Sequence, residues 1–104
     1  MTDMEQAEIR QNKAIRGYII RCLVKGFNNT ALTRQISNSM MAGGLVVSPD
    51  ISKYLNYLED AGYIEFTGEK VTAYTAYAKD AVIRLTKAGV DLAEGTTEDA
   101  GVDI

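Results

Sequence analysis

With 104 residues, the chain has room for one domain of ordinary size and a single hydrophobic core. Apolar residues make up 46% and charged residues 24% of the sequence, and no stretch approaches the roughly 20 apolar residues that a membrane-spanning helix needs. Histidine is absent and Cys22 is the only cysteine, which argues against a Ser–His or Cys–His catalytic pair and against a structural zinc site. Gly43-Gly44 lacks the Gly-Lys-Ser/Thr continuation of a nucleotide-binding loop. We therefore expect a protein that is not an enzyme and that uses no cofactor, metal or small-molecule substrate.

The net charge of −3 conceals an uneven distribution along the chain. Residues 10–89 hold all 11 lysines and arginines but only six acids, a balance of +5, whereas the two ends hold the other eight acids. The first ten residues include acids and no apolar core, so we expect no signal peptide, and the lone Cys22 fits a reducing cytoplasm. A basic middle is compatible with phosphate contacts but does not require them.

Helical periodicity dominates the first 62 residues. The first predicted helix runs from about Glu5 to Lys25 and ends before Gly26 and Asn28-Asn29. Thr30 is a plausible N-cap for a second helix over residues 31–41, with Leu32, Ile36 and Met40 on its buried side. Ser48-Pro49 combines a capping hydroxyl with proline at the first helical position, and so predicts the start of a third helix that ends near Asp60.

Alternating apolar residues replace this periodicity after Gly62. Ile64 and Phe66 predict a half-buried strand at 63–67, and Ile83 and Leu85 predict another at 81–85. Between them, residues 71–78 could be either a strand or an extended loop. Thr86 is placed to cap a short helix over residues 87–94. The acidic, glycine-containing residues 95–104 predict a disordered tail.

Three segments carry a resemblance to a known family. They are the helix–turn–helix stretch over residues 32–62, the segment 51–64 with its run Leu55-Asn56-Tyr57-Leu58-Glu59-Asp60-Ala61-Gly62-Tyr63-Ile64, and the closing segment 83–92 with its run Arg84-Leu85-Thr86-Lys87-Ala88-Gly89. In this order they resemble the winged helix-turn-helix DNA-binding family. The resemblance implies an α+β fold over residues 1–94, with a three-helix core, an antiparallel wing of two or three strands and a short C-terminal helix.

The same resemblance implies where DNA would be contacted. The N-terminal part of the third helix would face base edges in the major groove, and the second helix and the wing would reach phosphates. The residues that we expect at this interface are Arg34, Ser37, Asn38, Ser52, Lys53, Asn56, Tyr57, Lys70 and Lys79. We expect a transcriptional regulator that binds double-stranded DNA as a homodimer, with the first helix, particularly residues 5–16, as the main dimer element.

The third helix departs from the family pattern in its charge. It carries Asp50, Glu59 and Asp60 against the single base Lys53. An acidic surface forgoes the affinity that basic DNA-binding proteins obtain by neutralising phosphates. The alternative interpretation is therefore a winged-helix module that docks on another protein and does not bind DNA.

Overall fold

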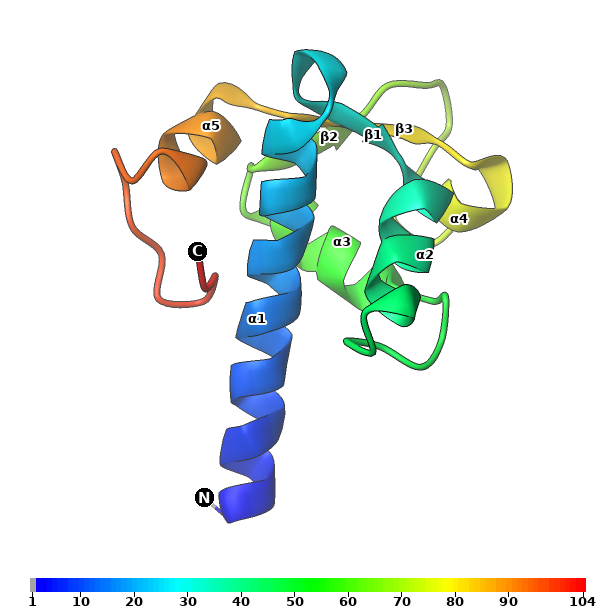
Figure 1. Ribbon diagram of the computed structural model, residues 1–104. Helices are drawn as coiled ribbons and strands as arrows, with labels where there is room; N and C mark the ends of the chain where they lie inside the picture. Colours follow the sequence, from blue (N-terminus) through cyan, green and yellow to red (C-terminus); the bar gives the residue numbers. More distant parts are fainter. Residues whose placement is uncertain (1) are drawn as a thin grey trace.

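The computed structural model describes residues 2–104 and has an α+β architecture. Across these residues, five α-helices surround a small antiparallel sheet of three strands (Figure 1). Helix α1 spans Asp3–Lys25, α2 spans Thr33–Ala42, α3 spans Ser52–Asp60, α4 spans Ala76–Lys79 and α5 spans Lys87–Ala93. Strand β1 spans Thr30–Leu32, β2 spans Ile64–Phe66 and β3 spans Val82–Leu85, while a 3-10 turn (η1, Phe27–Asn29) joins α1 to β1.

The sheet has the order β1-β3-β2, so the last strand of the sequence lies between the other two. Ala31 pairs with Ile83 on one side of β3, and Phe66 pairs with the same residue on the other side. This pairing buries Ile83 completely and Leu85 almost completely, as their alternation in the sequence predicts. The sheet thus pairs the strand that follows α1 with the strand directly before α5.

A single core joins the long helix to the sheet and to the two helices between β1 and β2. Ile19, Ile20 and Leu23 of α1 are fully buried and belong to the same apolar cluster as Leu58 of α3 and Ile83 of β3. Gly62, at a φ of 83°, ends α3 with a left-handed residue and turns the chain into β2. As predicted, the side chain of Thr86 accepts a hydrogen bond from the amide of Gly89 and caps α5.

Two predicted helix starts are wrong. Thr30 does not cap α2, because residues 30–32 pair with β3 as a strand and leave Leu32 42% exposed instead of buried. Likewise, α3 begins at Ser52 and not at Ser48, since the carboxylate of Asp50 accepts hydrogen bonds from both the amide and the hydroxyl of Ser52. In both places a tertiary or side-chain contact replaces the local capping that the sequence suggests.

Residues 67–81 connect β2 to β3 and are called the wing loop below. The sequence left residues 71–78 open between a strand and an extended loop, and the structure contains neither a strand nor a fully extended segment there. Turns bring Ala73 into the core at 3% exposure, and the short α4 follows. The left-handed residue Asp80 ends α4 and leads into β3.

The C-terminal residues 95–104 are ordered against the domain, contrary to the predicted disordered tail. Val102 is only 5% exposed, and the amide of Asp103 donates a hydrogen bond to the carbonyl of Lys13. The guanidinium groups of Arg16 and Arg21 bind the carbonyls of Gly101 and Asp103. These contacts are made largely by the backbone of the tail, which explains why the acidic composition did not reveal them.

Candidate nucleic-acid interface

Helix α3 presents its polar side to solvent as the sequence predicts, although only part of that side is free. Leu55 and Leu58 anchor the helix in the core, at 1% and 0% exposure. Lys53 is exposed on the opposite side, with its ammonium nitrogen 5.0 Å from the ring centre of Tyr54. Asn56 is half-buried, and its amide nitrogen lies 3.5 Å from a carboxylate oxygen of Asp60. Lys53 and Asn56 are therefore the side chains of α3 best placed to reach a ligand.

A groove of about 470 Å³ runs beside these two residues, between α3 and the middle of α1. Asn12 and Arg16 of α1 line one side, and Lys53, Asn56 and Asp60 line the other. Nothing in the sequence pattern placed Asn12 or Arg16 at this interface, because neither belongs to the helix–turn–helix segment. Only the crossing of α1 over α3 brings them there.

Tyr57 is not the free contact residue that the sequence predicts. The guanidinium carbon of Arg16 lies 3.6 Å from the centre of its ring, and its hydroxyl faces Gly101 of the C-terminal tail. The tyrosine is thus half-buried between α1 and the tail, in a cation–π stack that holds three elements together, and part of it still lines the groove. Its role in the structure is packing.

Ser37 is also wrongly predicted as a surface contact. Its side chain is completely buried, and its hydroxyl donates a 2.8 Å hydrogen bond to the carbonyl of Pro49. The bond fixes the loop that leads into α3. On a helical wheel Ser37 falls on the polar side of α2, but the returning loop covers that position.

We expect the replacement Ser37→Ala to lower the free energy of unfolding by roughly 1–2 kcal/mol, because it leaves the Pro49 carbonyl without its donor. Asn38→Ala is the matched control, since Asn38 is the exposed neighbour and its loss should change stability by less than about 0.5 kcal/mol. Urea unfolding of both variants measures the difference. Equal stabilities would show that the buried hydroxyl has no structural role.

The other predicted basic residues, Arg34, Lys70 and Lys79, lie in or against the wing loop, and two of them donate hydrogen bonds to its backbone carbonyls. Arg34 donates from Nε to the carbonyl of Tyr77 and from Nη2 to that of Ala78. Lys79 donates to the carbonyl of Lys70, and Lys70 itself is exposed at a left-handed φ of 61°. To bind a phosphate directly, Arg34 and Lys79 would have to leave their carbonyl partners.

Acidic side chains border the same surface. Glu59 and Asp60 are exposed at the end of α3, and Asp50 lies directly before its first turn. Hydrogen bonds from Ser52 hold the pKa of Asp50 below its usual value, so this carboxylate is charged at neutral pH. Around Lys53 the local charge is therefore negative.

The C-terminal tail adds an acid that the sequence did not single out. The hydroxyl of Tyr63 donates a 2.6 Å hydrogen bond to Asp99, whose other oxygen accepts from the amide of Gly101. This hydrogen bond stabilises the charged carboxylate and so lowers the pKa of Asp99. The same hydrogen bond is lost when the phenol ionises, which raises the pKa of Tyr63 to about 12. Asp99 thus fastens the tail beside the groove and does not face into it.

Residues 2–104 contain no group of three potential metal-ligating side chains, and no helix among them is long and apolar enough to cross a membrane. Comparison with protein-family models, with curated proteins and with solved structures found no match.

Proposed function

We propose that this protein is a cytoplasmic transcriptional regulator without catalytic activity, which binds double-stranded DNA as a homodimer through a winged helix-turn-helix. The order of elements supports the fold assignment: a strand between the first two helices, a helix–turn–helix, and two further strands that complete the sheet β1-β3-β2. Helix α3 is then the recognition helix, and the wing loop lies beside α2.

One observation carries the proposal. Helix α3 buries Leu55 and Leu58 while its first two turns leave Lys53 and Asn56 accessible beside an open groove. A lysine can bind the acceptors of guanine in the major groove, and an asparagine can bind adenine through two hydrogen bonds. Phosphate contacts would come from the exposed Asn38 and Lys70 and, after exchange of their carbonyl partners, from Arg34 and Lys79.

A titration of the protein with random duplex DNA at two salt concentrations tests the proposal. We expect measurable affinity at low salt that falls as salt rises, because each phosphate contact releases counterions. Replacing Lys53 by alanine should weaken binding by roughly 1–3 kcal/mol if it contacts a base, or reduce the salt dependence by about one charge if it contacts phosphate. Lys87→Ala is the matched control, since Lys87 is an exposed lysine on α5, outside the helix–turn–helix. Absence of binding at low salt would exclude the DNA function.

A specific observation favours a second candidate, a module that docks on a basic protein surface. Three acids, Asp50 directly before α3 with Glu59 and Asp60 at its end, outnumber the single base of this helix, Lys53. The double substitution Glu59→Gln with Asp60→Asn separates the two functions. If α3 approaches phosphates, removing two negative charges strengthens DNA binding, whereas for a basic protein partner the same change weakens the complex.

A further inference from the structure

Among residues 2–104, the start of α1 makes one hydrogen bond to another part of the chain, from the side-chain amide of Gln11 to the carbonyl of Leu45, and residues 2–10 make none. Figure 1 shows it extending well past α2, α3 and the C-terminus. Every residue from 2 to 11 is exposed, including Met4 at 81% and Ile9 at 38%. These residues add nothing to the core of a single copy, yet they continue the helix for more than two turns.

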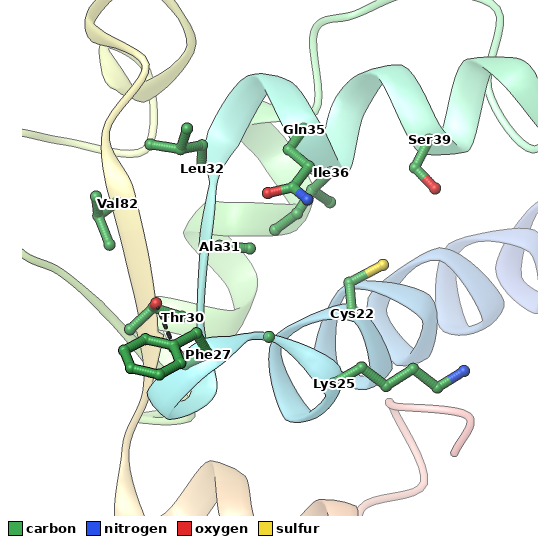
Figure 2. Close-up of a pocket in the computed structure, with 11 residues that line it drawn as sticks. Cys22, Lys25, Phe27, Thr30, Ala31, Leu32, Gln35, Ile36, Ser39 and Val82 are labelled. Carbon is green, nitrogen blue, oxygen red and sulfur yellow. Dashed lines mark hydrogen bonds between the residues drawn. The ribbon is translucent and has the colours of Figure 1, made fainter.

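An apolar groove lies near the other end of the same helix. About 530 Å³ in volume, it is bounded by the last turn of α1, by β1 and by α2. Cys22 and Gln35 point into the space between the two helices, and Phe27 and Leu32 stand on the side of β1 (Figure 2). Phe27 is 85% exposed and Leu32 is 42% exposed, so the rim of this groove presents an unusual amount of apolar surface to water.

A stripe along α1 connects the two features. Its members recur at alternating intervals of three and four residues, which places them on one side of a helix that packs against another helix. They are Met4, Ala7, Gln11, Ala14, Tyr18, Arg21 and Lys25. The alanines in the middle of this α1 stripe are small enough to let a second helix approach closely.

The charges of α1 indicate what that second helix is. Asp3, Glu5 and Glu8 make its beginning acidic, whereas all its charged residues from Arg10 to Lys25 are basic. Antiparallel pairing of two copies places acids against bases, and parallel pairing would place acids against acids. Asp3 and Lys25 lie equally far from Ala14 along the helix, so an antiparallel pair centred on Ala14 brings them together twice. Within residues 2–104, the ammonium group of Lys25 has neither an ion pair nor a hydrogen bond.

We infer that the partner of this surface is a second copy of the chain, packed antiparallel along the α1 stripe with its two-fold axis near Ala14. Met4 of each copy then enters the apolar groove of the other and covers Phe27 and Cys22. The carboxylate of Asp3 pairs with Lys25 across the same interface. Burial of Met4, Phe27 and Leu32 supplies the apolar contact area, and the charge pattern sets the orientation. The inference rests on the homodimer of the proposed function and names its surface.

A cross-linking experiment locates the two-fold axis. In a Cys22→Ser background, the substitution Ala14→Cys places two thiols close enough for a disulfide, because the β-carbons at such an axis meet at bonding distance. We expect a covalent dimer under mild oxidation. Ala88→Cys in the same background is the control, since Ala88 is exposed on α5, away from the stripe, and should remain monomeric on a non-reducing gel. Failure of the Ala14 variant to cross-link faster than the control overturns the inference.

Sedimentation equilibrium without DNA tests the orientation. Lys25→Glu should weaken self-association by roughly 3- to 30-fold, because two exposed ion pairs are lost per dimer. The double substitution Asp3→Lys with Lys25→Glu should restore it, and Lys70→Glu should have no effect. Deleting residues 2–9 should give a monomer with the unfolding free energy of one intact copy. A dimer that survives this deletion uses another surface, and the inference is then wrong. Since DNA is absent from these measurements, their outcome is independent of whether the protein binds DNA.

Discussion

Replacing Gly17 by alanine is expected to release the C-terminal tail and to lower the free energy of unfolding by about 1–3 kcal/mol. A β-carbon on Gly17 would overlap the carbonyl oxygen of Asp103, a backbone atom that cannot move without carrying the tail away from α1. The loss combines the hydrogen bonds from Arg16 and Arg21 to the tail with the burial of Val102. Chemical unfolding with urea measures it.

Deleting residues 99–104 should reverse the sign of the same substitution. Without the tail the new methyl group first meets the guanidinium of Arg21, at 3.3 Å, and this flexible side chain is free to move once its partner Asp103 is gone. Alanine in the interior of a helix is more favourable than glycine by about 1 kcal/mol. The shortened chain should therefore become more stable with Gly17→Ala. Gly43→Ala serves as a control in the full chain, because a β-carbon there meets its nearest atom, the Ser39 carbonyl oxygen, at an ordinary 3.5 Å. If Gly17→Ala stabilises the full chain as well, the tail is not held where the structure places it.

Gly89→Ala should lower the free energy of unfolding by about 1–3 kcal/mol, since α5 would have to withdraw from the sheet. Gly89 is buried where α5 crosses the start of β2, and a β-carbon would overlap the carbonyl of Tyr63 and come within 2.7 Å of the Leu85 side chain. Overpacking of a close helix–sheet contact typically costs this much. Thermal unfolding measures the loss.

Ala88→Ser is the matched control for Gly89→Ala, because Ala88 is the exposed neighbour on the same helix. It should shift the melting temperature very little. The Thr86 side chain also holds α5 in place: its hydroxyl donates a hydrogen bond to the Gly62 carbonyl, and its oxygen accepts one from the amide of Gly89. If Gly89→Ala leaves the melting temperature unchanged, α5 is not seated against β2 as tightly as the structure indicates.

Much of the candidate interface could be predicted because it depends on one helix alone. The spacing of Leu55 and Leu58 determines which side of α3 is buried, so the exposure of Lys53 follows from sequence. Ser37 and Tyr57 could not be assigned in this way. Each falls on the polar side of its helix, yet each contacts another part of the chain. Ser37 is covered by the loop at Pro49, and Tyr57 packs against Arg16 and the C-terminal tail.

Periodicity, glycine stops and the capping threonine at 86 were enough to establish an α+β chain with every helix but α4, and its two later strands, in the right order. These signals are local, because each depends on residues within one or two turns of one another. The conversion of residues 30–32 into an edge strand, the stacking of Arg16 on Tyr57 and the docking of residues 99–103 on α1 were decided by tertiary structure. In the first and the last of these, backbone carbonyls and amides find partners far along the chain, and backbone groups are the same in every residue, so composition carries no record of where they bind. The stack on Tyr57 joins side chains of two helices, and helical periodicity does not show which helices cross.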